Sequence, residues 1–464
     1  MSISSILNIA NSGIYAARTA IQTTSHNIAN ANTEGYARQE VLLQESKPVL
    51  TGYGYMGNGV QVKTVIRHVD QYLEKQICEA NTQTGEQKTY SSYMARIELI
   101  LDENKAHLGE KTQEFLAGWS DLALDPQSTG LKESLIQKGQ TLSSGINATY
   151  SSLSSLRLEV NSKIEESVIE INSLTSRIAK LNDIIFGANQ TGGEANDYMS
   201  QKAQLIKELS SKIDISTFDD QFGRTTVITK SGNILVENLQ SWELGIDSDI
   251  NGMNSIVWND KSGNSIDITD KIGNGEIKGL ITTRDEIIKG FIDDIEDYAK
   301  TIVTEVNSIH KTGYDQITGT TGTVFFKDIL SDYAKNMQIS ELILTDSRRI
   351  SPYTSADKTT DNDVAVAIAE LGDARLFKGG TQTYVEFSSS LTNQVGQMKA
   401  SADSMSDYYT DAVDMMNTQR ESISGVSLDE EITSLMKYQY AYQAAARLFS
   451  ISNQMLDELM EMVR

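Results

Sequence analysis

The feature that most constrains the fold of this chain is a narrow apolar stripe at each of its two ends. Steps of four and three residues select the N-terminal stripe, which consists of Ile3, Leu7, Ala10, Ile14, Ala17, Ile21, Thr24 and Ile28. The same steps select the C-terminal stripe, which consists of Leu428, Ile432, Leu435, Gln439, Tyr442, Ala446, Phe449, Asn453, Leu456, Met460 and Val463. Because such steps return to one face of an α-helix, the stripes predict helices about 40 Å and about 50 Å long.

A stripe this narrow cannot be buried by its own helix, so each one needs a partner. We therefore predict that residues 3–28 pair with residues 428–463 as a coiled coil. The first 33 residues carry a single charge, Arg18, among many Asn, Ser, Thr and Ala residues. A neutral outer face favours a helix that packs against neighbouring subunits, although an ordinary core helix also fits the pattern.

The residues between the two ends predict a mainly α-helical, elongated protein with an inserted β domain. Helical periodicity covers about 70–102, 113–124, 131–186, 198–212 and 283–311, and it resumes after about 360. Alternating segments predict strands at 60–66, 225–229, 233–236, 242–246 and 255–258. A chain of 464 residues exceeds one typical core. We therefore expect nested parts: a terminal coiled-coil assembly domain (1–60 and 415–464), a helical bundle domain with some β structure (61–216 and 276–414), and a β-rich outer domain (217–275).

The charge of the chain excludes two classes of partner. The net charge is -23 and the isoelectric point is about 4.6. Proteins that bind nucleic acids or anionic membrane surfaces draw their affinity from clustered Lys and Arg. The composition therefore predicts no nucleic-acid partner and no membrane partner.

The chain has neither a disulfide framework nor a recognisable targeting segment. Cys78 is the single cysteine, and we interpret it as a small packed residue rather than as a nucleophile. No run of about 20 apolar residues is present, and the N-terminus lacks the basic region of a cleavable signal peptide. Taken alone, these features favour the cytosol.

Two loops imitate binding motifs. Residues 52–57 match the G-x-G-x-x-G pattern, but a strand follows where a dinucleotide site needs a helix, so we interpret the glycines as turn formers. Asp247, Asp249 and Asn251 copy the opening of an EF-hand loop, but Trp258 stands where the closing Glu belongs. We expect a β-turn there, and weak calcium binding stays open.

The remaining chemistry-bearing residues form no catalytic pattern. The four histidines, at positions 26, 68, 107 and 310, lie far from one another in sequence, and no nucleophile elbow or phosphate loop occurs. We therefore predict that the chain is not an enzyme and has no catalytic residue, no cofactor and no metal.

Three blocks of sequence carry a resemblance to a known family. Residues 25–30 (SHNIAN) and 33–39 (TEGYARQ) resemble the N-terminal signature of flagellar rod, hook and hook-associated proteins. Residues 424–431 and 438–447 (YQYAYQAAAR) resemble the C-terminal signature of the FlgK-type hook-associated protein, and residues 275–315 resemble its middle helix. The resemblance spans most of the chain in the right order.

The resemblance implies a mechanical function outside the cell. Members of the family are exported unfolded through the flagellar type III channel and form the adaptor layer between hook and filament, which overturns the cytosolic expectation. The implied partners are copies of the same chain in a ring, the hook protein, the next hook-associated protein toward the filament and a cytoplasmic export chaperone. The implied assembly residues are the two stripes and, within the N-terminal signature, Asn27, Asn30, Thr33, Gly35 and Tyr36. The alternatives are a hook or rod protein and, from another class, a secreted enzyme displayed on the flagellum.

The C-terminal stripe has a consequence for the free subunit. A lone apolar stripe invites aggregation, and packing supplies most helical stability in proteins. We therefore expect residues from about 425 to 464 to be largely disordered before assembly, and the export chaperone to take up this stripe.

Overall fold

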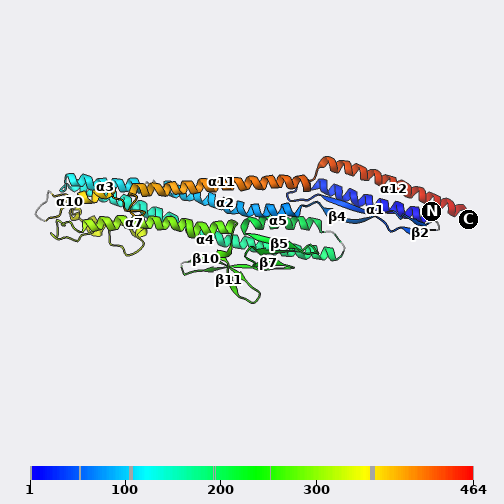
Figure 1. The fold of residues 1–464 in the computed structure, drawn as a ribbon, viewed down its shortest axis with the longest axis horizontal. Helices are drawn as coiled ribbons and strands as arrows, with labels where there is room; N and C mark the ends of the chain where they lie inside the picture. The colour runs from blue at the N-terminus through cyan, green and yellow to red at the C-terminus, as the bar shows by residue number, and fades with distance from the viewer. Residues whose placement is uncertain are drawn as a thin grey trace.

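The chain forms a long rod in which both termini lie at the same end (Figure 1). The computed structural model describes residues 3–51, 54–103, 108–191, 193, 195–250, 252–355 and 361–462. Several residues that the sequence analysis singles out lie outside the described residues, namely Gly52, His107, Asn251 and Val463.

The end of the rod that carries both termini is built from two helices and four strands, which we call the terminal unit. Its elements are α1 (Ile3–Ala29), β1 (Gln39–Glu45), β2 (Val49–Thr51), β3 (Gly54–Met56), β4 (Val60–Arg67) and α12 (Leu428–Met462). β1 and β4 pair antiparallel, and β2 and β3 form a hairpin. The helices predicted at both ends of the chain are confirmed.

The rest of the rod is a helical bundle whose longest member is α4, with 62 residues. Its helices are α2 (Gln71–Glu103), α3 (Leu108–Leu124), α4 (Thr129–Gln190), α5 (Asn196–Lys212), α6 (Glu276–Thr282), α7 (Lys289–His310), α8 (Tyr333–Asn336), α9 (Glu341–Thr345), α10 (Asp363–Ala369) and α11 (Tyr384–Ser424). A π-helical segment, η2 (Thr283–Ile288), joins α6 to α7, and short 3₁₀ turns lie at Thr269–Lys271, Ser347–Arg349 and Glu370–Gly372. Two helices begin earlier than predicted, at Leu108 and at Glu276.

Apolar and aromatic side chains fill the bundle as one continuous core. At the end opposite the termini, where Figure 1 shows α3 and α10, the rings of Phe377 and Phe387 stack with their centroids 4.5 Å apart. α11 begins there with a capping box, in which the Thr383 hydroxyl accepts from the Glu386 N–H and the Glu386 carboxylate accepts from the Thr383 N–H. From this point α11 runs along α2 back to the terminal unit.

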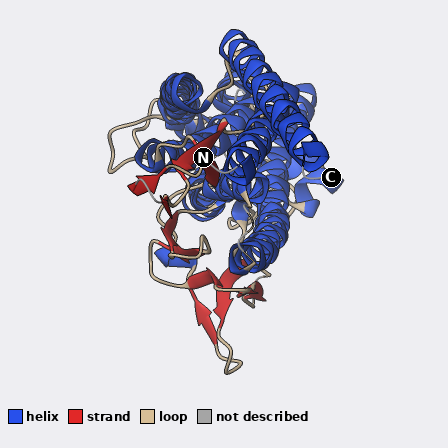
Figure 2. Cartoon of the chain, turned by 90° about the vertical axis from the view of Figure 1, so that its right-hand side faces the viewer, coloured by secondary structure: helices blue, strands red, loops and turns tan. Residues whose placement is uncertain are grey.

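The inserted β segment forms two small antiparallel sheets on one side of the rod, which Figure 2 shows at the lower edge of the molecule. One sheet has the order β5–β6–β7–β8 and the other the order β11–β10–β9. The strands are β5 (Ile215–Asp219), β6 (Thr225–Thr229), β7 (Ile234–Glu237), β8 (Gln240–Ser241), β9 (Leu244–Ser248), β10 (Asn254–Asn259) and β11 (Ser265–Asp267).

Three asparagines on one face of α4 attach these sheets to the bundle. The amide of Asn182 donates to the Thr225 carbonyl (2.8 Å) and accepts from the Thr225 N–H (2.9 Å). Asn172 binds both backbone groups of Leu244 in the same way, and Asn161 does so with Gly252 and Asn254. Each side-chain amide pairs with a backbone N–H and a backbone C=O of the sheets, as a neighbouring strand would. The sheets therefore lie against the side of α4 rather than at the tip of the rod.

Among the described residues, no helix is both long enough and apolar enough to cross a membrane.

Candidate functional site: the terminal helices and their attachment

α1 and α12 pack side by side along the terminal unit, in opposite directions. A side chain added at Gly13 would meet the Ala445 Cβ at 3.3 Å, and the Asn27 amide nitrogen lies 3.0 Å from the Glu431 carboxylate. Advancing along α1 from Gly13 to Asn27 therefore means returning along α12 from Ala445 to Glu431. The predicted pairing of the two ends is confirmed.

Small residues bring the two helices close together. The buried residues of α1 are Ala10, Ala16, Ala17, Ala20, Thr24 and Asn27. Those of α12 are Glu431 and Ser452, with Leu435, Tyr438, Ala445 and Leu456 half-buried. Side chains without bulk allow the backbones to approach, so the centre of this seam is occupied by alanine, glycine and serine.

The seam is rotated from the stripes that the sequence predicts. On α12 it follows positions 431, 438, 445 and 452, each one residue before a predicted stripe position. Leu435 and Leu456 belong to both the seam and the predicted stripe, so the seam is turned by about half of the roughly 100° that separates neighbouring residues on an α-helix. The prediction that the full stripe is buried is therefore wrong for Leu428 and Ile432, which stay 48% and 47% exposed. It is also wrong for Gln439 and Asn453, which are exposed rather than in the seam.

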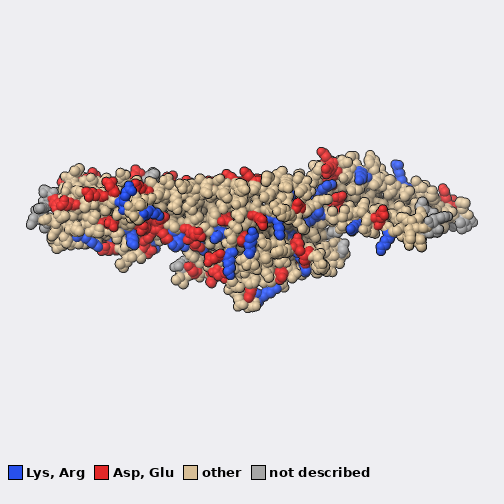
Figure 3. Space-filling view, in the orientation of Figure 1, with Lys and Arg blue, Asp and Glu red and all other residues tan. Residues whose placement is uncertain are grey.

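The exposed apolar residues of α12, which we call the outer stripe, lie mostly away from the seam, although Leu459 continues the seam positions seven residues after Ser452. Its members are 41–83% exposed: Ile432, Met436, Tyr440, Leu448, Ile451, Met455, Leu459 and Met462. Charged side chains are sparse over the terminal unit compared with the bundle (Figure 3). An apolar face of this length on a surface is typical of a protein–protein contact.

The remaining predicted stripe residues surround the seam. Ile3, Leu7, Ile14, Ile21 and Ile28 on α1 are half-buried. On α12, Tyr442 and Phe449 stay 40% and 36% exposed.

A buried asparagine joins the terminal helices to the first strand. The Asn27 oxygen accepts from the Gln39 N–H (3.0 Å) and from the Tyr36 hydroxyl (2.8 Å). The Asn27 nitrogen donates to the Gln39 carbonyl (2.8 Å) and to the Glu431 carboxylate (3.0 Å). Asn27 is 1% exposed, so four hydrogen bonds satisfy an amide that water does not reach.

Ion pairs continue this attachment to α11 and α2. The Arg38 guanidinium donates to Glu431 (2.8 Å), which is 2% exposed. The Arg420 guanidinium, near the end of α11, donates to Glu74 on α2 (2.7 Å) and to the Gly35 carbonyl (3.0 Å). Gly35 adopts φ +77°, a conformation that favours glycine. These contacts fix where α12 leaves α11, although nothing in the sequence pairs Arg38 with Glu431.

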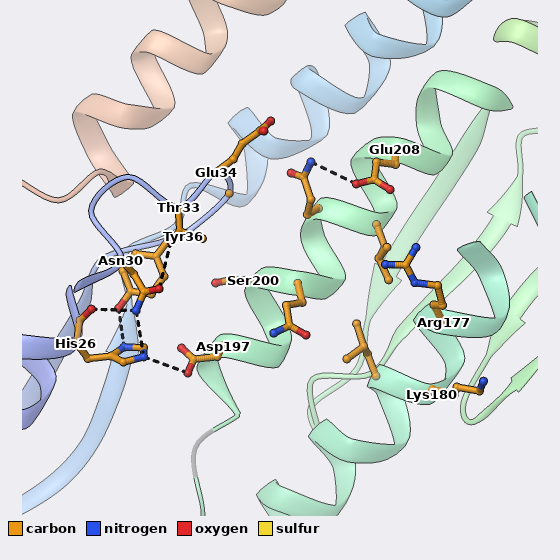
Figure 4. Close-up of a pocket in the computed structure, with 15 residues that line it drawn as sticks. His26, Asn30, Thr33, Glu34, Tyr36, Arg177, Lys180, Asp197, Ser200 and Glu208 are labelled. Carbon is orange, nitrogen blue, oxygen red and sulfur yellow. Dashed lines mark hydrogen bonds and ion pairs between the residues drawn. The ribbon is translucent and has the colours of Figure 1, made fainter. Parts of the chain in front are cut away.

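The other signature residues line a pocket of about 560 Å³ between the loop after α1 and the helices α4 and α5 (Figure 4). The Asn30 amide donates to the His26 ring (3.2 Å), and Thr33 donates to the Asn30 oxygen (3.2 Å). The His26 ring lies 3.0 Å from the Tyr36 hydroxyl. Burial, and next the charge of Asp197, raise the pKa of Tyr36 well above its usual value. The phenol therefore stays protonated and donates to Asn27.

The described parts of the two segments that imitate binding motifs lie in β-hairpins: residues 54–56 form β3, and Asp249 follows β9 just before its partner strand β10. The glycine-rich segment continues from β3 to β4, and Gly59 adopts φ +92°. A side chain at Gly59 would meet the Ser12 hydroxyl at 2.2 Å on α1, so glycine is required for this close approach. In the other loop the Asp249 carboxylate accepts from the Met253 N–H (2.8 Å). Among the described residues, no group of His, Cys, Asp and Glu side chains is arranged to hold a metal ion.

His310 is a structural residue of the bundle. The Ser351 N–H donates to its Nε2 (3.1 Å), so the proton is on Nδ1, which donates to the Thr323 carbonyl (2.8 Å). Burial lowers the pKa of His310 to about 4. The folded bundle therefore holds this imidazole neutral.

We expect acid to weaken the bundle through His310. An unfolded histidine binds a proton below about pH 6.5, whereas the folded one resists until about pH 4. The stability contributed by the neutral ring is complete above pH 6.5 and is lost as the pH falls toward 4, by about 2 to 3 kcal/mol at pH 4.5. Burial raises the pKa of Asp214 to about 6, and its titration acts in the opposite direction.

A comparison of the wild type with the variant His310→Gln isolates the contribution of His310 to this pH dependence. Guanidinium unfolding of wild type and His310→Gln, followed by tryptophan fluorescence, should differ less at pH 4.5 than at pH 7. Trp119, whose ring lies 5.7 Å from His310, is the local probe. An equal difference at the two pH values would show that His310 does not titrate on unfolding.

Comparisons with known proteins agree at both ends and in the middle of the chain. The model of the flagellar hook-associated protein FlgK helical domain matches residues 94–326, half of the chain. The model of the flagella basal body rod protein matches residues 7–36, and that of the flagellar basal body rod FlgEFG protein C-terminal matches residues 418–462.

Curated relatives match over their full lengths. Flagellar hook-associated protein 1 of Bacillus subtilis is 25% identical over 98% of this chain and 97% of its own. That of Salmonella typhimurium is 25% identical over 99% and 100%. Among solved structures, the flagellar hook junction protein FlgK from Burkholderia pseudomallei has the same fold, with a TM-score of 0.66, 15% identity and coverage of 75% of this chain and 100% of that chain.

The paired terminal helices and these matches define a structural protein of the bacterial flagellum. More narrowly, the chain belongs to the family of the flagellar hook-associated protein FlgK, or hook-associated protein 1. The family is structural and non-enzymatic, and its place is the hook–filament junction of the extracellular flagellum.

Proposed function

We propose that the chain is a subunit of the adaptor layer that joins hook to filament, and that it is held there by its terminal unit. The observation that carries this proposal is the outer stripe of α12, whose members stay 41–83% exposed in the single chain. Neighbouring subunits would cover it and remove its apolar surface from water. Copies of the chain in a ring, the hook protein and the next hook-associated protein are the proposed partners.

The predicted assembly residues divide into two groups under this proposal. Asn27 and Tyr36 are buried within the subunit, 1% and 8% exposed, so they act by holding the terminal helices to the bundle. Ile432, Tyr442 and Phe449 present exposed apolar surface to neighbours. The assembly domain (1–60 and 415–464), the bundle (61–216 and 276–414) and the outer β domain (217–275) keep their proposed roles.

The contact between the two ends of the chain bears on export. α1 and α12 meet over their lengths, so the pair forms only after the last residues are available. A chain that leaves the cell unfolded through the flagellar type III channel would complete this pair outside. A cytoplasmic chaperone would hold the C-terminal helix until then.

A hook or rod protein is the second candidate, because models of rod proteins match both ends of the chain. Deletion of the gene separates the two functions. An adaptor predicts cells that keep their hooks and release unassembled flagellin into the medium. Loss of the hooks would instead identify a hook or rod protein.

Closing the seam is expected to be essential for assembly. Ala17 is 5% exposed in the seam, so Ala17→Asp would bury a charge without a partner. We expect cells with this variant to resemble the deletion strain, as measured by flagellin in the medium and filaments in micrographs. Gln22→Asp is the control, because it adds the same charge at an exposed position of α1. In this variant the amides of α1 and α12 should stay protected from hydrogen exchange. Full filaments with Ala17→Asp would contradict the role of the seam.

A further inference from the structure

The methionines of this chain are concentrated in its last two helices. The sequence contains 14 methionines, and those from residue 398 onward are Met398, Met405, Met415, Met416, Met436, Met455, Met460 and Met462. Elsewhere, Met94 and Met337 are 1% and 0% exposed and fill the core of the bundle. The C-terminal helices therefore use methionine in a different way from the rest of the chain.

Three of these methionines belong to the outer stripe of α12. Met436, Met455 and Met462 are 48%, 47% and 83% exposed. They alternate along the stripe with Ile432, Ile451 and Leu459. Their thioether sulfurs are thus open to solutes in the single chain, on a face whose use in assembly requires it to be apolar.

We propose that Met436, Met455 and Met462 are oxidation sites through which a peroxide blocks incorporation of the free subunit. This proposal rests on the proposed role of the outer stripe in assembly. The thioether sulfur attacks hydrogen peroxide, the O–O bond breaks, and one oxygen is transferred to the sulfur while the rest leaves as water. The sulfur is oxidised by two electrons and the peroxide is reduced by two.

Oxidation to the sulfoxide turns an apolar side chain into a polar one. A sulfoxide is polar and chiral, whereas the thioether is flexible and apolar. Burying it against an apolar neighbour leaves its oxygen without a hydrogen-bond donor, which is unfavourable. Oxidation therefore acts against docking of the stripe and leaves the α1–α12 seam, on another face, unchanged.

Oxidation acts on free subunits and not on assembled ones. Once neighbours cover the outer stripe, the same sulfurs are shielded from peroxide. Subunits that are already assembled keep their place, and only chains still free are blocked. The effect persists until a reductase restores the thioether.

The test uses the full-length chain and isolated hooks from cells that lack the gene. Binding to the hooks is quantified before and after hydrogen peroxide, with sulfoxides located by peptide mass mapping. We expect at least a tenfold loss of binding for the oxidised wild type. The triple variant Met436→Leu, Met455→Leu and Met462→Leu should bind untreated and keep its binding after treatment.

A matched control and a mimic complete the design. Leucine at Met56, Met199 and Met253, which are half-buried elsewhere, should leave the sensitivity to peroxide unchanged. Glutamine at Met436, Met455 and Met462 should reduce binding without peroxide. The proposal is overturned if the triple leucine variant loses binding as the wild type does, or if mapping shows these sulfurs equally oxidised in free and assembled chains. Failure of untreated wild type to bind would instead refute the proposed function.

Discussion

Alanine in place of Asn27 is expected to release the terminal helices from the bundle while the bundle itself stays folded. The change removes four hydrogen bonds, to the Gln39 backbone, the Tyr36 hydroxyl and the Glu431 carboxylate. Tyr36 and Glu431 are 8% and 2% exposed, and a buried group left without its partner costs about 1 to 3 kcal/mol. We expect the change to reduce the stability of the terminal unit by about 3 kcal/mol in total.

Hydrogen exchange with mass spectrometry measures this release directly. A change of about 3 kcal/mol corresponds to roughly a hundredfold increase in local opening, and the increase should cover α1, β1 and the start of α12. Peptides of α3, α4 and α7 should exchange as in wild type. Increased exchange along the whole rod would show that the attachment supports the global fold rather than the terminal unit alone.

Asn30→Ala is the matched control, because it removes the same chemical group one turn further along the chain. Asn30 is half-exposed, and its amide contacts the His26 ring and the His26 carbonyl. Water can replace these bonds, so its effect should stay below about tenfold. A larger effect than that of Asn27→Ala would place the attachment in the loop rather than in the buried amide.

A methyl group added at Gly85 is expected to destabilise the bundle strongly. The added Cβ would lie 2.1 Å from the Ser211 carbonyl oxygen and 3.3 Å from the Glu276 backbone nitrogen. Both neighbours are backbone atoms, so α2 must move away from the end of α5 and the start of α6. Overpacking of this kind costs about 1 to 3 kcal/mol or more, and Gly85→Val should cost more than Gly85→Ala.

Alanine at Gly396 is expected to stabilise the protein, in contrast to alanine at Gly85. Gly396 lies within α11, and a Cβ there would meet nothing within 4 Å. Alanine is the better helix former by about 0.5 to 1 kcal/mol, so Gly396→Ala should raise the denaturant midpoint. Thermal and guanidinium unfolding of both variants provide the measurement. Equal effects of alanine at the two positions would contradict the close approach at Gly85.

Some parts of this molecule follow from sequence because their signals are local. The ends of the chain form helices, and the strands near 225–229 and 255–258 appear where alternation predicts them. The described part of the glycine-rich segment and the loop around Asp249 lie in β-hairpins, which agrees with the strand that follows each of them. Periodicity and turn chemistry act within a few residues, so a single sequence carries them completely.

Other parts depend on contacts between residues far apart in the chain. Asn161, Asn172 and Asn182 look like ordinary polar positions of a long helix, yet each completes the backbone pairing of a strand. No local pattern reports such a pairing, and therefore the attachment of the β insertion along α4 could not be predicted from the sequence.

By itself, the sequence determined the helical ends, the long bundle, the inserted strands and the family, because periodicity and signature motifs depend only on residues close together in the chain. Only the tertiary structure decided which face of α12 closes onto α1. Glu431 is a surface residue by composition, but Asn27 and Arg38 bury it, and Gly13 admits Ala445. Those contacts turn α12 by about 50° from the predicted stripe and leave other apolar residues of the helix exposed. Close packing of small residues outweighs the burial of larger ones farther from the seam.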